Sequence, residues 1–482
     1  MPLRAKLQMQ QATRAEMSTA HAQMAREVFM PQQDDDPEDV LFNSLYGLRS
    51  IELNRPAKLN AINGSMIRKI GSRLAEWKKS DMANIIVIKG AGPKAFCAGG
   101  DVAALANLNK MGEEGIKKSI EYFGLEYKLD HLISTYNKPY IAFMDGITMG
   151  GGVGLSIHAP FRIATERTVF AMPETGIGFF PDVGASFFLP RMPGAVGTYL
   201  GLTSSRLTGP NVFYSGIATH YLHSSSLPQL ESRLAELRFK DYDDMSHRLA
   251  VINATIEEYC TGLPHDQPIL LGGELRKAID RCFSFNTVPA IIRALEAEEG
   301  PAKPWAQQTL KTLNEKSPTS IHVTLRQMRI GAGWSILQTF QREYHMAAKF
   351  MKHHDFTEGV TARLIEKRDP KWQPELLVDI DPEDDISTGF FTVDNKLEPL
   401  RLLSDGDYSS YPYQGCGLPT ESEVATVVKE GIKTQKQVLN HFLKETRHKQ
   451  GVEEVVREIL ERKTFVEAKD EDRIAVWDDA TQ

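Results

Sequence analysis

Two acids stand in an apolar, turn-rich segment between residues 172 and 190, MPETGIGFFPDVGASFFLP. Glu174 and Asp182 have phenylalanines, glycines and prolines as neighbours. A buried carboxylate costs several kcal/mol unless it is paired, and otherwise it takes up a proton. These acids therefore either fill a structural role or act as a general base or nucleophile. The structural alternatives are a helix cap or an ion pair of Glu174 with an arginine such as Arg191, and a turn cap by Asp182.

Two glycine clusters each follow an apolar run and precede a helical pattern: Ala98-Gly99-Gly100-Asp101 and Gly150-Gly151-Gly152. Glycines allow a ligand close to the backbone, and helix N-termini present unpaired amides. Two such loops can direct two N–H groups at one oxygen, as an oxyanion hole does. The alternative is that these glycines only permit tight turns. Neither loop fits the dinucleotide or phosphate-loop pattern, so nucleotide binding is not favoured.

The elements that must position these residues follow from hydrophobic periodicity. Short apolar runs alternate with helical patterns, which predicts an α/β fold with mainly parallel strands. A β-hairpin is expected over residues 40–53, with Gly47 near its turn. Further strands are expected at residues 85–88, 140–144, 161–164 and 168–171, and helices at 63–78 and about 115–135.

The second half of the sequence reads as helical. The chain is expected to turn helical from 194 to 222 and to be largely helical from 228 to 367. A charged helix over about 421–463 has a plausible N-cap at Thr420 and a predicted break near Gly451. The acidic run 32–39, QQDDDPED, is predicted to be a flexible joint.

The composition is ordinary for a globular protein: 482 residues, 41% hydrophobic and 25% charged. The formal net charge of −7 gives no overall attraction to nucleic acid or membrane. No apolar run approaches the roughly 20 residues of a membrane span. Four cysteines without metal-ligand spacing are typical of a reducing interior.

The first 26 residues are basic. Arg4, Lys6, Arg14 and Arg26 outnumber the single acid Glu16. This composition favours a mitochondrial presequence, and the alternative is a mildly basic tail.

Several motifs together resemble one superfamily. AFCAGGDV, DGITMGGGVG and MPETGIGFFPDVGASFFLPR resemble the crotonase (enoyl-CoA hydratase/isomerase) superfamily. ASFFLPRMPG, SGIATHYL, SPTSIHVTLRQ and HDFTEGVTARLIEKRDPKW narrow the resemblance to the 3-hydroxyisobutyryl-CoA hydrolase branch, over about residues 40–372. The tail beyond about residue 385 is outside the match. The resemblance implies a crotonase-type spiral of β-β-α turns, followed by a helical C-terminal region and a charged helical tail.

On this resemblance the chain divides into four parts. Residues 1–39 are the basic tail and acidic linker, and residues 40–222 are the spiral core. Residues 223–374 are a helical domain covering the pocket, and residues 375–482 are a C-terminal extension.

The resemblance also implies a catalytic site. The amides of Gly100 and Gly151 bind the thioester carbonyl, and Gly151 also contacts the substrate. Glu174 either attacks the thioester directly or acts as a general base on water; the sequence does not separate these routes. Enoyl-CoA hydratases place a second catalytic glutamate where this chain has Gly154, so hydratase activity is disfavoured.

The remaining substrate contacts follow from the same comparison. Asp182 is expected to orient the substrate hydroxyl or a water, and Glu126 is expected to bind that hydroxyl. Lys58 lies where crotonase-like proteins contact coenzyme A. The alternatives are a solvated helix face for Glu126 and a plain surface position for Lys58. Ala185-Ser186 stands where glycines are expected in the branch, and these side chains could narrow the pocket.

The implied function is hydrolysis of 3-hydroxyisobutyryl-CoA, or a close 3-hydroxyacyl-CoA, in valine catabolism in the mitochondrial matrix. No cofactor is expected beyond the coenzyme A of the substrate, and no metal, since the adjacent His353 and His354 point apart on a helix. Superfamily members commonly form trimers or dimers of trimers, a monomer or a dimer is the alternative for this branch, and the sequence does not decide the oligomeric state. Neither DNA nor a membrane is an expected partner.

The alternative function is structural. Some mitochondrial relatives of this branch, of a fungal type, resemble components of the small subunit of the mitochondrial ribosome, with its proteins and rRNA as partners. The tail from residue 429 to 463 mixes lysines and arginines with many glutamates. This mixture fits a protein-docking or solvated helix better than direct RNA binding, which favours basic excess. The two functions are not exclusive.

Overall fold

The computed structural model describes residues 23–240, 242–381, 384–431, 433–469 and 472–479. The basic segment that resembles a presequence lies almost entirely outside these residues. Ala25 and Phe29 are buried, and the Phe29 ring packs against Gly71 in the core. The folded core therefore already includes these residues.

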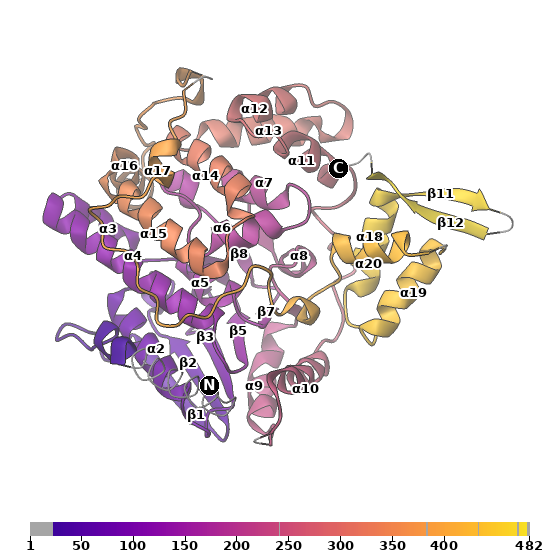
Figure 1. The fold of residues 1–482 in the computed structure, drawn as a ribbon, viewed down its shortest axis with the longest axis horizontal. Helices are drawn as coiled ribbons and strands as arrows, with labels where there is room; N and C mark the ends of the chain where they lie inside the picture. Colours follow the sequence, from indigo (N-terminus) through magenta and orange to yellow (C-terminus); the bar gives the residue numbers. More distant parts are fainter. Residues whose placement is uncertain (1–22, 241, 382–383, 432, 470–471, 480–482) are drawn as a thin grey trace, which may run out of the picture.

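Two stacked sheets form the core (Figure 1). In the three central turns of the spiral, the first strand joins the larger sheet, the second joins the smaller one, and a helical segment or loop returns the chain, whereas both strands of the first hairpin belong to the larger sheet. Within these two sheets only the β1–β2 and β8–β9 pairs are antiparallel. The arrangement is the predicted α/β spiral. The larger sheet has the order β1 (Val40–Leu45), β2 (Leu48–Leu53), β3 (Ile85–Gly90), β5 (Tyr140–Met144), β7 (Phe161–Ala164) and β10 (His220–Tyr221), and the smaller has β4 (Ala95–Cys97), β6 (Ile147–Met149), β8 (Val169–Ala171) and β9 (Leu207–Thr208).

The larger sheet is covered on both faces. On β3, Ile85 and Val87 pack toward α9 (Leu227–Ala235) and α10 (Met245–Glu257), whereas Ile86 faces the main core. Burial on both faces explains the continuous β-branched run of this strand. Within the region 223–374, α9 and α10 therefore cover the outer face of this sheet.

The helix predicted over residues 63–78 is confirmed as α2 (Gly64–Trp77). The side chain of Asn63 caps it by accepting a hydrogen bond from the Met66 amide at 2.8 Å. Met66, Ile70 and Leu74 form its buried stripe.

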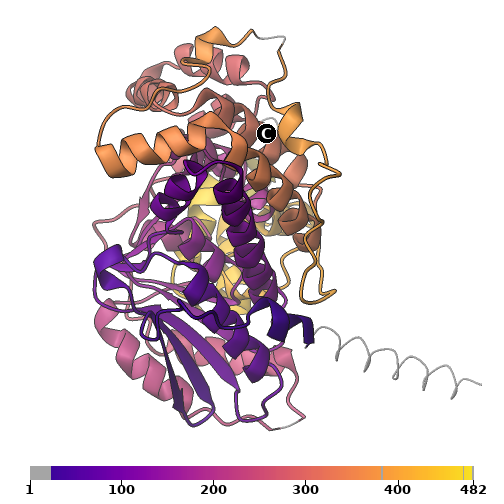
Figure 2. The same ribbon diagram turned by 90° about the vertical axis from the view of Figure 1, so that its left-hand side faces the viewer.

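Helices from distant parts of the chain pack against the helices that border the glycine loops. α4 (Glu113–Ser134) packs against α15 (Ile336–Lys352), and α16 (His354–Val360) packs on α3 (Val102–Asn109) and on the short helix η2 (Glu174–Ile177). In Figure 2 the orange helices α15 and α16 lie above the purple first half of the core. The other helices of this region are α11 (Gly273–Phe283), α12 (Val288–Glu296), α13 (Lys303–Asn314), α14 (Pro318–Gly331) and α17 (Thr388–Phe391).

The prediction of a helical stretch from 194 to 222 is only partly right. The segment contains α7 (Val196–Thr203) and α8 (Pro210–Tyr214), but also β9 and β10. These two-residue strands exist because they pair with β8 and β7, a tertiary contact that leaves no local periodicity.

The prediction that the acidic run 32–39 is a flexible joint is wrong. Asp35 forms an ion pair with Arg68, and Asp39 is paired with the Lys69 ammonium group at 2.7 Å. Both bases lie on α2, so the acidic run is fastened to the core.

The charged tail forms three helices rather than one. α18 (Glu421–Lys429) begins at a capping box on Thr420, α19 (Gln435–Glu445) follows, and α20 (Val452–Lys463) starts after Gly451. The break at Gly451 is confirmed, since this residue adopts a φ of 82°. The hairpin β11 (Thr464–Lys469) and β12 (Asp472–Trp477) completes the lobe, which projects from one end of the molecule in Figure 1.

Buried ion pairs attach this lobe to the helical region. Glu421 accepts hydrogen bonds from Arg276 of α11 at 3.1 Å and from Arg462 of α20 at 2.9 Å. Among the described residues, no helix has the length and apolar character needed to cross a membrane.

Candidate active site

The amide of Gly100 faces away from the strand that borders it. Ile62 donates to the Gly99 carbonyl at 2.8 Å and accepts from the Asp101 amide at 2.9 Å. In a parallel bridge, Ile62 bonds to the residues on either side of Gly100 and not to Gly100 itself. The N–H of Gly100 therefore points away from Ile62.

Gly151 is the first residue of α5 (Gly151–Ile157), so its amide has no acceptor within the helix. It lies beside the first loop: a Cβ atom placed on Gly151 would be 3.4 Å from the Gly100 nitrogen. The preceding Gly150 adopts a φ of 46°. The two predicted amide donors are therefore neighbours.

Glu174 opens η2 and is only 4% exposed. A Cβ atom placed on Gly150 would lie 3.1 Å from its Oε1, so the carboxyl group faces the glycine loop. Its Oε2 meets no donor among the described residues. Arg191 donates instead to carbonyl groups, including those of Phe187 and Trp334, so the alternative of an ion pair with Arg191 is wrong.

Asp182 is held by a hydroxyl group. Its Oδ2 accepts a hydrogen bond from the Tyr127 hydroxyl at 2.7 Å. The next residue, Val183, adopts a φ of 54°, which is rare and costly for a β-branched side chain. The carboxylate of Glu343 holds this strained turn by accepting from the amides of Gly184 at 2.8 Å and Ser186 at 2.9 Å.

Glu126 lies with Glu174, Asp182 and Glu343 in a cluster of buried acids, the carboxylate cluster. It is 3% exposed on α4, so the alternative of a solvated helix face is wrong. A Cβ atom on Gly151 would be only 2.5 Å from its Oε1, and this oxygen meets no donor among the described residues. Glu126 and Glu174 thus both border the second glycine loop, which the residue types alone did not reveal.

Burial raises the pKa of each acid in the cluster. It raises the pKa of Glu174 and Glu126 well above the usual range, and the charge of Asp182 adds to both shifts. Burial also raises the pKa of Asp182 to about 7 and that of Glu343 to about 8. An apolar wall explains part of this, because Phe179 stacks on Phe123 at a centroid distance of 5.0 Å.

Lys316 is the cation near Glu174. Its ammonium group lies 3.4 Å from the position of a Cβ on Gly176, and burial lowers the pKa of Lys316 to about 8. Its positive charge acts against the burial that raises the pKa of Glu174.

Replacing Lys316 tests this electrostatic support. Lys316→Met should move the acid limb of kcat/KM for thioester cleavage to higher pH by about half a unit to one unit, because Glu174 loses a stabilising charge. Lys316→Arg keeps the charge and serves as the matched control. Equal pH profiles for the two variants would show that the charge has no influence on Glu174.

Lys58 lies at the surface near the glycine loops. It ends the short helix η1 (Pro56–Lys58) and is exposed. The carbonyl of Leu59 accepts from the Ala98 amide at 3.0 Å, which connects this turn to the first loop. Ser186, in contrast, accepts from the Gln327 side chain at 2.8 Å and so faces α14.

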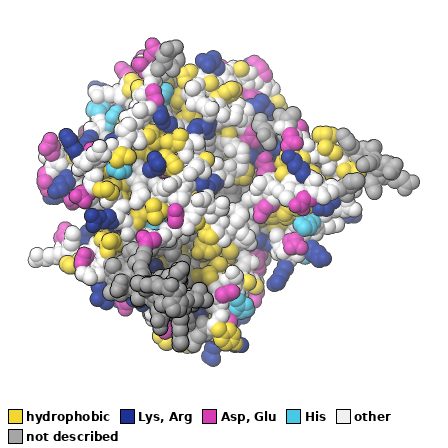
Figure 3. Space-filling view, viewed as in Figure 1, with side chains coloured by type: hydrophobic (Ala, Val, Ile, Leu, Met, Phe, Trp, Pro, Cys, Tyr) yellow, Lys and Arg dark blue, Asp and Glu magenta, His cyan; other side chains and the backbone are white. Residues whose placement is uncertain are grey.

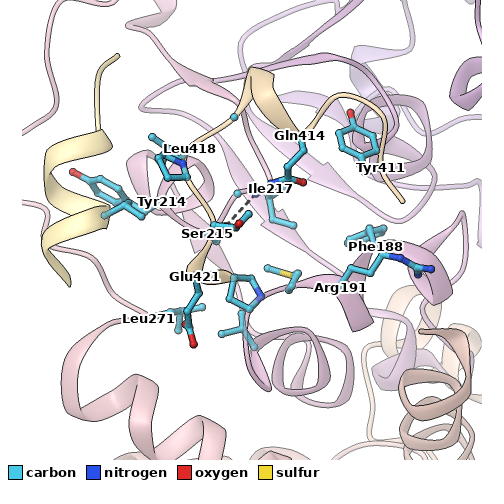
Figure 4. Close-up of a pocket in the computed structure, with 18 of the residues that line it drawn as sticks. Phe188, Arg191, Tyr214, Ser215, Ile217, Leu271, Tyr411, Gln414, Leu418 and Glu421 are labelled. Carbon is cyan, nitrogen blue, oxygen red and sulfur yellow. Dashed lines mark hydrogen bonds between the residues drawn. The ribbon is translucent and has the colours of Figure 1, made fainter. Parts of the chain in front are cut away.

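A separate cavity of about 200 Å³ lies between the core and the C-terminal extension. In Figure 4, Arg191 and Tyr411 lie near one end of this cavity and Glu421 near the other. None of the predicted catalytic or substrate-binding residues lines it. The cavity is therefore distinct from the carboxylate cluster.

Four residues of the cluster are absent from the sequence-based prediction: Tyr127, Asp130, Glu343 and Lys316. Asp130, a buried acid of α4, lies four residues after Glu126, so helical spacing could have suggested it once Glu126 was identified. Tyr127 follows Glu126 directly and is also buried, but helical spacing does not connect the two. Glu343 and Lys316 come from α15 and the loop before α14, and no local pattern connects them to Glu174.

Comparison with known proteins places the core in one family. A family model described as enoyl-CoA hydratase/isomerase matches residues 48–390. The crystal structure of a carnitinyl-CoA dehydratase from Mycobacterium thermoresistibile has a TM-score of 0.64 and 34% sequence identity, covering 74% of this chain and 97% of that chain.

Curated relatives fall into two groups. The small ribosomal subunit protein mS47 of Neurospora crassa is 62% identical over 470 residues, which cover 96% of this chain and 91% of that protein. Mitochondrial 3-hydroxyisobutyryl-CoA hydrolases of Gallus gallus and Homo sapiens are 42% and 41% identical, covering 76% and 74% of this chain and 90% and 89% of those proteins. The ribosomal relative therefore also matches most of the segment after residue 390.

Proposed function

The chain belongs to the enoyl-CoA hydratase/isomerase family, and on this premise we propose that it hydrolyses an acyl-CoA thioester, 3-hydroxyisobutyryl-CoA or a close 3-hydroxyacyl-CoA. One observation carries the proposal: the buried carboxyl group of Glu174 faces the second glycine loop with one oxygen free of protein donors among the described residues. The hydrolase relatives, at 41–44% identity, support the choice of substrate.

Hydrolysis requires two actions from these residues. The amides of Gly100 and Gly151 stabilise the negative charge that develops on the thioester oxygen. Glu174 then supplies the nucleophile, either by removing a proton from water or by attacking the carbonyl carbon to form a mixed anhydride that water cleaves. In both routes the C–S bond breaks, a C–O bond forms, and coenzyme A leaves as the thiolate, which takes up a proton. Both routes need Glu174 in its ionised form.

Recognition of the 3-hydroxyl group follows from the other acids. Glu126 and Asp182 are buried polar groups that a substrate hydroxyl can satisfy, and a substrate without it leaves them unpaired. Lys58, at the surface beside the first loop, is suited to a phosphate of coenzyme A. No resident cofactor takes part.

The direct test measures release of coenzyme A thiol from 3-hydroxyisobutyryl-CoA and isobutyryl-CoA by the purified chain. The proposal predicts fast cleavage of the first and a kcat/KM at least about 100-fold lower for the second, because the site reads a hydroxyl group. No cleavage of either thioester would contradict the proposal. We assign the reaction to valine catabolism in the mitochondrial matrix; the hydrolase relatives are named as mitochondrial proteins.

A second function rests on a different observation. The relative that matches the C-terminal extension is a small ribosomal subunit protein, whereas the family model ends at residue 390. In Figure 3 the charged side chains of the described residues are interspersed by sign on the face shown. Such a surface fits docking to ribosomal proteins better than extended contact with rRNA.

Sedimentation tests this second function independently of catalysis. If the extension docks on the small subunit of the mitochondrial ribosome, the full chain should sediment with that subunit at moderate salt, and a catalytically inactive variant should do so equally well. A chain that stays at the top of the gradient would contradict this role and leave the hydrolase proposal intact.

A further inference from the structure

The proposed mechanism does not use Asp130, a buried acid one helical turn after Glu126 on α4. Asp130 is 1% exposed, and neither of its oxygens meets an N–H or O–H donor among the described residues. Its carboxyl group lies over Gly154: a Cβ atom placed there would be 2.8 Å from Oδ2 and 2.9 Å from Oδ1. The Asp130 side chain, which comes from α4, therefore fills the space into which a side chain at position 154 of α5 would project.

The surroundings of Asp130 favour its neutral form. Burial raises the pKa of Asp130 well above its usual range, and the charges of Glu126, Asp182 and Glu343 raise it further. The ionisable groups that face it are Glu126 on α4, Asp182 before α6 (Ala185–Phe188), Glu343 on α15, Tyr140 on β5 and Cys97 on β4. All five are acids, so no neighbouring cation in this set stabilises an Asp130 carboxylate.

Two of the other acids, Asp182 and Glu343, differ from Asp130 in their hydrogen bonds. Tyr127 donates to Asp182, and two amides donate to Glu343, so both of these carboxylates are stabilised as anions. Both oxygens of Asp130 lack such a donor among the described residues, compared with one buried oxygen each of Glu126 and Glu174, so Asp130 is the acid best suited to hold a proton. A protonated carboxyl group is a hydrogen-bond donor.

We propose that Asp130 is a positioning residue that acts through Glu126. In its neutral form it donates a hydrogen bond to the Glu126 carboxylate, and Glu126 is then oriented to accept the hydrogen bond of the substrate 3-hydroxyl group. The inference rests on the proposed function and deepens it, because it assigns the hydroxyl preference to a pair of acids on one face of α4.

Binding measurements on an inactive background test the role without turnover. In Glu174→Gln, calorimetry measures the Kd of 3-hydroxyisobutyryl-CoA and of isobutyryl-CoA. The Kd of isobutyryl-CoA divided by that of 3-hydroxyisobutyryl-CoA gives the preference for the hydroxyl group. Adding Asp130→Leu, which cannot donate, should lower this ratio about tenfold. Adding Asp130→Asn, which keeps a donor of similar shape, should retain it.

The pH dependence separates this role from simple packing. On the Glu174→Gln background, the preference should fall as pH rises through the raised pKa of Asp130, because the donor is lost. With Asp130→Asn it should persist at about pH 9, since the amide does not titrate. A preference that Asp130→Leu leaves intact, or that falls equally with pH in the parent and Asp130→Asn, would overturn the inference. If the leucine variant does not fold, the pH comparison decides alone.

Failure of the proposed function gives a different result. If the Glu174→Gln parent binds neither thioester, or binds both equally, the hydroxyl recognition itself is absent, and the role of Asp130 falls with it. If the parent shows the preference but Asp130→Leu does not lower it, only the role of Asp130 is wrong.

Discussion

Glu174→Gln should lower kcat for cleavage of 3-hydroxyisobutyryl-CoA by at least about 1,000-fold, because an amide of the same shape neither removes a proton from water nor attacks the carbonyl carbon. The loss should lie in kcat, with little change in substrate binding, since Glu174 acts on the reacting carbon. Release of coenzyme A thiol by the purified variant measures it.

A stability measurement shows whether the loss comes from misfolding. Glu174 has a raised pKa in the folded chain, so its ionisation opposes folding increasingly as pH rises above its unfolded value. The glutamine variant should therefore unfold at a Tm equal to or above that of the wild type at about pH 8. Glu296→Gln, at an exposed position on α12, is the matched control and should retain full activity. Wild-type turnover by Glu174→Gln would remove Glu174 from the mechanism.

The second large effect is expected at the glycine loop. A methyl group on Gly151 would lie 2.5 Å from Oε1 of Glu126 and 2.9 Å from Cγ2 of Ile62, both far closer than van der Waals contact. Gly151→Ala should displace Glu126 and disturb the amide that faces the thioester. We expect kcat/KM to fall by about 100- to 1,000-fold, the loss typical of one oxyanion-hole donor.

The matched control is Gly389→Ala, in the short helix α17. A Cβ atom placed there meets nothing within 4 Å, so the same substitution should leave kcat/KM and Tm unchanged. If Gly151→Ala retains wild-type activity while Gly389→Ala does too, the second loop does not border the reacting thioester.

The sequence predicted the site best where polar residues or glycines stand in an otherwise apolar segment. Glu174 and Asp182 stand out among phenylalanines, and the glycine clusters around Gly100 and Gly151 follow apolar runs, so the sequence indicated both halves of the site. Glu126 was predicted only from the family resemblance, because a glutamate on a helix is usually exposed to solvent. Its burial depends on α15, which is more than 200 residues away in the sequence.

The features that the sequence-based prediction does not contain depend on long-range contacts or on local sequence patterns that it does not use. Glu343 sits in the apolar stripe of α15 and is explained only by the strained turn at Val183 that its carboxylate holds. The prediction of a flexible joint at residues 32–39 is wrong because the bases that pair with Asp35 and Asp39 lie on α2. In the tail, Thr434 and Gln437 form a capping box that begins α19. This local pattern predicts a helix start that the sequence-based prediction does not include.

The central claim is that the amides of Gly100 and Gly151 and the side chain of Glu174 meet at one thioester. A crystal structure of Glu174→Gln with intact 3-hydroxyisobutyryl-CoA tests it most directly. The account predicts the carbonyl oxygen within about 3 Å of both amide nitrogens, and the residue 174 side chain facing the carbonyl carbon. A thioester bound elsewhere, such as in the cavity beside the C-terminal extension, would contradict it.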